Sequence, residues 1–189
     1  MNERKRELTP EQKQYLIDLK RKPNEDDVRY KEIIKQKLLE DDILIWLLNN
    51  KKLEEDNAEN DEYFGVNIKP AFIIPETQAE VQNYLCYEIS FEDTSRYNPD
   101  VKYQEIIFYI LCHEADSIVP EIGAARQDLI AGLLIDKFNG TNYFGNQLKL
   151  VSDKPSVTDN KFSTRILVFE QKSTNSLTKA DGKTFNLRR

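Results

Sequence analysis

The fold of this chain is decided by the stretch Tyr103-Gln-Glu-Ile-Ile-Phe-Tyr-Ile-Leu-Cys112. The stretch is rich in β-branched and aromatic residues, and beyond Glu105 both alternate sets of side chains are apolar, which is typical of a strand covered on both faces. It is bounded by polar residues and is too short to cross a bilayer as a helix. We therefore predict a central strand over 101–113, around which the other elements pack.

The neighbouring segments predict further strands of the same sheet. Residues 81–91 mostly alternate apolar and polar side chains, as a strand with one buried face does. A turn over 94–100 would join this strand to 101–113 as an antiparallel hairpin. Prolines bracket 67–75 and restrict a short strand there to an edge. Two more strands are predicted at 147–151 and 162–171, with a loop over 152–161 between them. Together these segments predict an antiparallel sheet of about four to five strands.

Two main helices are predicted to pack this sheet. From about Asp27 the apolar residues are spaced for one helical face, and Asp41-Asp42 can break this helix and cap a second segment. Residues 120–139 form the clearest helical pattern in the chain, with Asn139-Gly140 as its stop signal. The predicted class is α+β, in the order helix, strand, strand, helix, strand, strand.

An arm is expected at each end of the domain, which we place at 27–171. In the N-terminal arm, 1–26, Thr9-Pro-Glu-Gln12 predicts a capping box that opens a short helix through Lys20. The C-terminal arm, 172–189, is rich in Ser, Thr, Asn and Lys and is too poor in apolar residues to order itself. Its cations oppose a single acid, Asp181, so we expect a flexible basic arm.

The composition excludes several classes of partner. The net charge of −6 and the pI near 5.0 provide no basic surface for wrapping nucleic acid and argue against an anionic membrane as partner. Cys86 and Cys112 lie inside predicted strands and do not form a disulfide framework, so we expect reduced thiols. Since no signal peptide or membrane-spanning run is evident, we expect a soluble intracellular protein at synthesis.

The sequence does not predict an active site or a cofactor. It has one histidine, His113, in the sequence Cys112-His-Glu-Ala-Asp116. His113, Glu114 and Asp116 could contribute to a metal site, but first-row metal sites usually recruit more than one His or Cys. We therefore favour a polar residue at a strand end, and we expect neither an enzyme nor a metal site.

One constellation supports an alternative of another class. Asp153 and Glu170-Gln-Lys172 resemble the Asp…Glu-x-Lys signature of the restriction-endonuclease-like nucleases, in which two carboxylates hold magnesium and the lysine assists the attacking water. Such nucleases usually present a basic face to the duplex, whereas this chain is acidic.

A candidate subunit interface lies in the first main helix, at Leu44, Trp46 and Leu48. Trp46 and Leu48 widen the apolar stripe of this helix beyond a single seam. A helix that is apolar over so much of its circumference is expected to contact two surfaces, either the sheet and a neighbouring helix or the sheet and another subunit. The alternative for any one of these residues is a contact within the core.

The chain resembles the tail-completion or tail-terminator proteins of long-tailed bacteriophages over roughly Asp27 to Gln171. The hairpin carries this resemblance together with three stretches, which are Ile33-Ile-Lys-Gln-Lys-Leu-Leu-Glu-Asp-Asp-Ile-Leu-Ile-Trp-Leu-Leu48, Phe72-Ile-Ile-Pro75 and Gly123-Ala-Ala-Arg-Gln-Asp-Leu-Ile-Ala-Gly-Leu-Leu134. The family has no catalytic motif, so the resemblance rests on the pattern of apolar residues and on the order of helices and strands along the chain.

The resemblance implies a structural virion protein that forms a ring, typically a hexamer. Such a ring caps the tail tube protein and joins the tail to the head-side connector, in the tail or neck of the virion and, during assembly, in the host cytoplasm. DNA is implied only as the passing genome, which an acidic channel wall would not adsorb. The alternative within virion assembly is a head-tail connector or stopper protein, which we expect to be richer in β-barrel strands.

Overall fold

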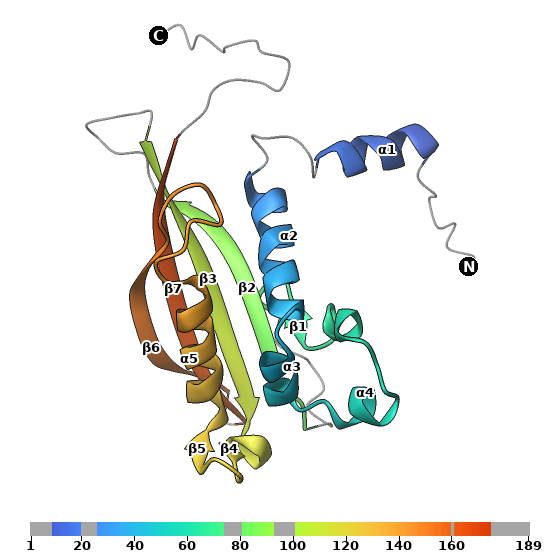
Figure 1. Ribbon diagram of the computed structural model, residues 1–189, viewed down its shortest axis with the longest axis vertical. Coiled ribbons are helices and arrows are strands. Elements are labelled where there is room, and N and C mark those ends of the chain that lie inside the picture. Colours follow the sequence, from blue (N-terminus) through green and yellow to red (C-terminus); the bar gives the residue numbers. More distant parts are fainter. Residues whose placement is uncertain (1–8, 20–25, 74–80, 93–100, 160, 175–189) are drawn as a thin grey trace, which may run out of the picture.

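The computed structural model of the 189-residue chain has the predicted α+β class, with helices packed on one side of a main sheet (Figure 1). It describes residues 9–19, 26–73, 81–92, 101–159 and 161–174. The predicted turn over 94–100, and the predicted C-terminal arm beyond residue 174, lie outside these ranges. Within them, no helix has both the length and the apolar character needed to cross a bilayer.

The main sheet has five strands in the order β1-β2-β3-β7-β6, so β3 is central. β3 spans Val101–His113, which confirms the bounds predicted for the central strand. β2 and β7 flank it in antiparallel register, and Phe108 lies opposite Tyr87 on one side and Leu167 on the other. The other long strands are β2 (Tyr84–Glu92), β6 (Lys149–Asp159) and β7 (Phe162–Thr174).

We predicted a purely antiparallel sheet, but the edge strand β1 makes the sheet mixed. β1 is only Ile68–Lys69, and it pairs in parallel with Leu85 and Cys86 of β2. Pro70 follows it directly, and a proline cannot donate to a ladder. The edge position predicted for this segment is therefore confirmed, although the antiparallel direction is wrong.

The opposite edge strand, β6, is longer than predicted and includes most of the segment expected as a loop. Its pairing with β7 is irregular, with register shifts between Leu150 and Ser152 and between Val157 and Asp159. Pro155 also lies inside it. These features are tolerated at a sheet edge, where one side of the strand has no ladder to maintain, and they weaken the alternation by which a strand is predicted.

The first main helix is divided as predicted. α2 spans Asp26–Leu39 and α3 spans Asp42–Leu48. Between them Asp41 is the N-cap of α3, and its Oδ1 accepts hydrogen bonds of 3.1 Å from the backbone N–H groups of Ile43 and Leu44. Short helices follow at α4 (Lys51–Glu55), η1 (Asn60–Tyr63) and, after β3, η2 (Glu114–Asp116).

The second main helix, α5, begins later than predicted. It spans Arg126–Phe138, whereas the prediction began at residue 120. The residues before it form a small hairpin of β4 (Ile118–Val119) and β5 (Ala124–Ala125), and Gly123 lies in the turn with a φ of +70°. A left-handed glycine is favoured in a turn and disfavoured inside a helix. The predicted stop is confirmed by Gly140, with a φ of +79°.

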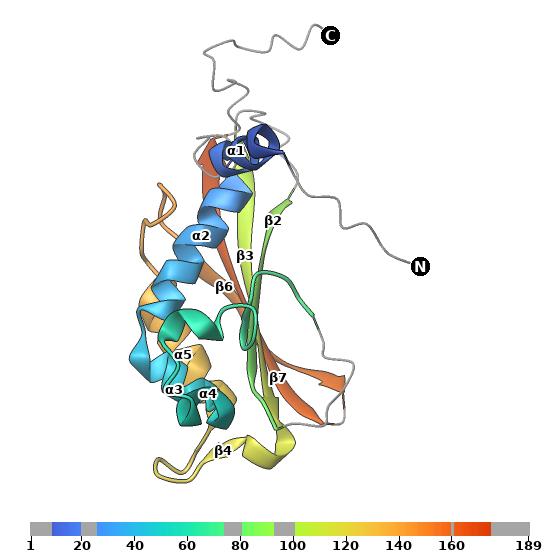
Figure 2. The ribbon, with the colours of Figure 1, turned by 90° about the vertical axis from the view of Figure 1, so that its right-hand side faces the viewer.

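The two faces of the sheet differ. α2, α3 and α5 all lie on one face, and the main core fills the space between them and the sheet (Figure 2). On the other face Tyr109 is only half-buried, within a smaller cluster that includes Phe72 and Phe162. The prediction that β3 is covered on both faces is therefore right only for the helix-covered face and for one end of the open face.

α1, Pro10–Leu19, begins with the predicted capping box. The N–H of Gln12 donates to Thr9 Oγ1 at 3.2 Å, and the N–H of Thr9 donates to Gln12 Oε1 at 2.9 Å. Every side chain described from Thr9 to Asp18 is exposed.

Candidate functional site

The residues predicted for a subunit interface face in two directions. Leu44 and Leu48 are 1% and 0% exposed and belong to the main core, so they pack within the subunit. Trp46 is 46% exposed. Of the three, only Trp46 lies on the surface, and the prediction of an interface now depends on it.

Trp46 lies in an apolar groove between α3 and α5, with a volume of about 330 Å³. On α3 the groove is bordered by Ile43 and Trp46, and at the turn before α5 by Ile122; these three side chains are 46–60% exposed. The remaining lining residues are Leu47, Asp128, Leu129, Gly132 and Leu133, and we call the whole set the α3–α5 groove.

The sequence of α3 explains why it has an outer apolar face. Its seven residues are Asp-Ile-Leu-Ile-Trp-Leu-Leu, so apolar side chains follow the first position all around the helix. Those that face the sheet are buried, whereas Ile43 and Trp46 are spaced i, i+3 and share the outer face. A helix that is apolar on all sides needs a second surface to cover it.

Gly132 deepens the floor of the groove, because it has no side chain. It lies in the interior of α5, where glycine is less favourable than alanine by about 1 kcal/mol. A Cβ built on Gly132 would meet nothing within 4 Å, so packing inside the subunit does not require a glycine there. The missing side chain instead lets another element approach the backbone of α5 closely.

Polar contacts join the two walls of the groove, α3 and α5, at both ends. At one end, Lys137 of α5 donates to Asp41, the N-cap of α3, with Nζ 2.8 Å from Oδ2. At the other end, Arg126 of α5 donates from Nη1 to the carbonyl oxygen of Leu47 at 2.8 Å. The groove is thus held at a fixed width.

Arg126 also anchors a buried polar cluster beneath this end of the groove. It is 4% exposed, and it donates from Nη2 to Oδ1 of Asp116 at 2.7 Å and from Nε to the Asp116 carbonyl oxygen at 2.8 Å. Partners on two segments, Leu47 and Asp116, satisfy the guanidinium, as a buried charge requires. We call the set Asn50, Asn67, Asn83, Asp116 and Arg126 the polar cluster.

Asn83 joins the polar cluster to the sheet. Its side-chain amide donates to the carbonyl oxygen of Leu48 at 3.1 Å and to Oδ2 of Asp116 at 2.7 Å. Its Oδ1 accepts from the backbone N–H of His113 at 3.0 Å. The start of β2 is thereby tied to the end of α3 and to the end of β3.

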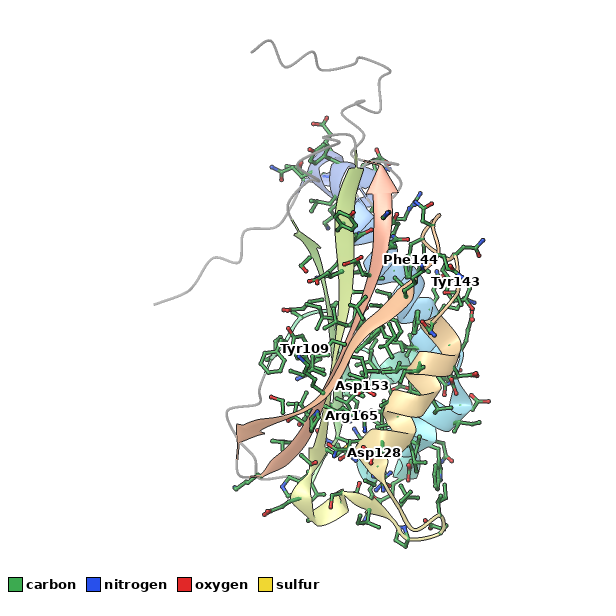
Figure 3. All side chains as sticks on the ribbon, turned by 90° about the vertical axis from the view of Figure 1, so that its left-hand side faces the viewer. Tyr109, Asp128, Tyr143, Phe144, Asp153 and Arg165 are labelled. Carbon is green, nitrogen blue, oxygen red and sulfur yellow. The ribbon has the colours of Figure 1, made fainter. Side chains whose placement is uncertain are left out.

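The residues of the nuclease alternative lie on different faces of the sheet. Asp153 lies opposite Leu167 on the helix-covered face, where both of its oxygens accept from Arg165 at 2.6 and 2.7 Å (Figure 3). That pairing holds the pKa of Asp153 below its usual range. Glu170 alternates with the buried Phe169 and faces the open side, where it lines a separate polar cavity with Lys172. The two carboxylates therefore do not share a metal-binding position.

His113 ends β3 as a structural residue. Its Nδ1 accepts from the N–H of Ala115 at 3.2 Å, and its ring lies edge-on to Phe162. Glu114 is exposed, and the Asp116 carboxylate is taken up by the polar cluster. Among the side chains that the structure describes, no group of three or more His, Cys, Asp or Glu residues could hold a metal ion.

Both cysteines are free and buried. Burial raises the pKa of Cys86, and it raises the pKa of Cys112 to about 12. Neither thiol is poised for chemistry at neutral pH, because the thiolate is the reactive form.

The sequence alone did not identify the rest of the groove. Ile122 was assigned to a helix, although Gly123 beside it signalled a turn. Leu129 and Leu133 were expected to cover the sheet, and they are partly buried against the core while lining the groove. Arg126 was not singled out, since its partner Leu47 is 79 residues away in the chain.

Comparison with known proteins gives one informative result. No match was found among curated proteins. The sequence matches the YomW family over residues 41–171, more than half of its length. The match runs from the N-cap of α3 into β7, so it includes the groove, whereas α1 and α2 precede it. The family name suggests a Bacillus phage-related gene product, which is consistent with a phage origin. The chain therefore belongs to the YomW family.

Proposed function

We propose that this protein is a structural virion component that forms a ring, terminates the phage tail tube and joins the tail to the head-side connector. The observation that carries the proposal is the α3–α5 groove, in which Ile43, Trp46 and Ile122 are each about half exposed. Contiguous apolar surface of this kind marks an interaction site in soluble proteins.

The form of the groove supports a contact between two different surface patches, which can repeat around a ring or be exchanged between two copies. A concave site is complementary to a protruding element on another copy, not to itself. Such a contact is called heterologous. It closes into a ring when the rotation that relates neighbouring copies is a whole fraction of 360°. The acidic balance of the chain supports a wall past which DNA moves without adsorbing.

The architecture favours a terminator over a connector or stopper. We expected a stopper to be richer in β-barrel strands. The described strands instead form a sheet with β1 and β6 at its edges and helices on one face. The nuclease alternative loses its support because Asp153 and Glu170 lie on opposite faces.

The proposal is tested by the solution mass of the purified protein, measured by light scattering alone and with the tail tube protein. We expect a closed ring, or a monomer that enters a ring when the tube protein is added. Trp46→Asp should abolish the ring, because a carboxylate in the groove opposes apolar packing. The matched control is Val151→Asp, which changes an exposed apolar residue on β6 and should leave the mass unchanged.

Two results would contradict the proposal. One is a chain that stays monomeric with and without the tube protein. The other is a ring that Trp46→Asp leaves intact while circular dichroism shows an unchanged fold.

A further inference from the structure

We infer that the α3–α5 groove of one copy receives α1 of a neighbouring copy. This inference rests on the proposed self-assembly and names the segment that mediates it. Its starting point is a pair of exposed apolar features on the described surface, one concave and one convex. The groove is concave, and α1 is a preformed helix whose side chains from Glu11 to Asp18 are all exposed.

α1 has the apolar content that such a groove requires. Tyr15, Leu16 and Ile17 are each 47–58% exposed. By helical spacing Tyr15 and Leu16 lie within an arc of about 100° and form one apolar stripe, whereas Ile17 lies on the other side of α1. A helix of ten residues is short, and without tertiary contacts it is marginal in water, so docking would stabilise it.

The floor of the groove suits a helix. Gly132 leaves open space above α5, and a small residue at the crossing point lets two helices approach closely. Leu129 and Leu133 flank Gly132 on one wall, and Trp46 stands on the other. An apolar stripe set between these walls would bury both surfaces at once.

The charges of the arm and of the body are complementary. Asp136 is exposed one turn after Gly132, whereas Asp128, one turn before it, already pairs with Arg165; Lys13 of α1 is exposed three residues before Leu16. Residues 1–22 contain seven Lys and Arg against four Asp and Glu, and residues 172–189 contain five against one. Out of the total of −6, this leaves −13 on residues 23–171. An arm of the opposite sign is attracted to the body of a neighbour and is steered toward it at low salt.

The inference is tested by mixing two full-length variants with one new cysteine each and adding a short bifunctional maleimide. One variant is Leu16→Cys, on the apolar stripe of α1, and the other is Gly132→Cys, on the groove floor. The matched control replaces Leu16→Cys with Gln14→Cys, on the opposite side of α1. Cys86 and Cys112 are 0% exposed and should not react.

We expect a covalent dimer when Leu16→Cys is mixed with Gly132→Cys, and no such dimer when Gln14→Cys is mixed with Gly132→Cys. Each mixture is measured alone and with the tail tube protein. Gly132→Gln in the otherwise native chain should fill the groove and reduce the ring fraction in light scattering, while the fold is retained.

Three results would overturn the inference. Equal cross-linking from Leu16→Cys and Gln14→Cys would show that α1 does not seat by its apolar stripe. Cross-linking within a single chain that carries both Leu16→Cys and Gly132→Cys, without dimer in the mixture, would assign the groove to its own α1. Rings without cross-linking would remove this inference and leave the proposed function standing, whereas monomers under both conditions would remove the proposed function itself.

Discussion

Helices α3 and α5 build two adjoining regions of opposite character. Inside the subunit they enclose the polar cluster, in which Asn83 and Arg126 are almost completely buried. Outside they form the groove, in which Ile43 and Trp46 are about half exposed. Both regions therefore reverse the usual distribution, because polar residues are buried in the first and apolar residues are exposed in the second.

The two regions differ in where their side chains find contacts. The buried amides and the guanidinium find their partners within the chain, as backbone carbonyls and the Asp116 carboxylate. The described part of the chain provides no cover for Ile43 and Trp46. Changes in the polar cluster should therefore reduce folding stability, whereas changes in the groove should leave folding intact and reduce assembly.

The largest effect is expected from Arg126→Ala. It would leave Asp116 without its cation and the Leu47 carbonyl oxygen without a donor, and removing one partner of a buried pair costs about 3–5 kcal/mol. Urea unfolding followed by circular dichroism would measure this loss. A loss below about 1 kcal/mol, the usual value for a surface ion pair, would mean that the polar cluster does not hold the fold.

A smaller effect is expected from Asp41→Asn, which keeps the N-cap oxygen of α3 and removes the ion pair with Lys137. The loss should be about 1 kcal/mol, because Asp41 and Lys137 are less deeply buried than Arg126. Thermal unfolding at pH 7 would measure it, with Asp42→Asn as the exposed neighbouring control.

The same carboxylate predicts a pH dependence. Burial acts to raise the pKa of Asp41, but hydrogen bonds from Lys137 and from the N–H groups of Leu44 and Ile43 outweigh burial and lower it. The stability it contributes is therefore fully present above the pKa of the unfolded chain, about 4, and is lost as the pH falls through the lower pKa of the folded state. The difference between the native protein and Asp41→Asn should shrink over that acid range; a constant difference would contradict the assignment.

The smallest effect, of opposite sign, is expected from Gly132→Ala in the monomeric state. Alanine is the better helix former and its Cβ has open space, so unfolding should become less favourable by about 0.5–1 kcal/mol. Chemical denaturation at a concentration too low for assembly is the appropriate measurement. Destabilisation would show that Gly132 is required by the fold and not by an occupant of the groove.

The features that the sequence predicted well are those set by local chemistry. The central strand follows from its own residues, the break at Asp41 from an acid at an N-cap, and the box at Thr9 and Gln12 from their spacing. The α+β class follows from these local patterns taken together.

The features that the sequence did not predict depend on contacts between distant residues. The start of α5 at Arg126 reflects contacts with Leu47 and Asp116, and the periodicity of the preceding residues carries no sign of either. Leu44 and Trp46 are equally apolar in the sequence, and only the packing of α3 on the sheet separates an inner face from an outer one.

The outermost strand, β6, affects how the protein behaves when many copies are crowded together. A long, regular strand at the edge of a sheet is a template on which another chain can add, and repeated addition produces fibrils. β6 is eleven residues long, but Pro155 and two register shifts interrupt it. Stacking of sheets edge to edge is therefore disfavoured at β6, and copies at high concentration are kept from aggregating through this edge.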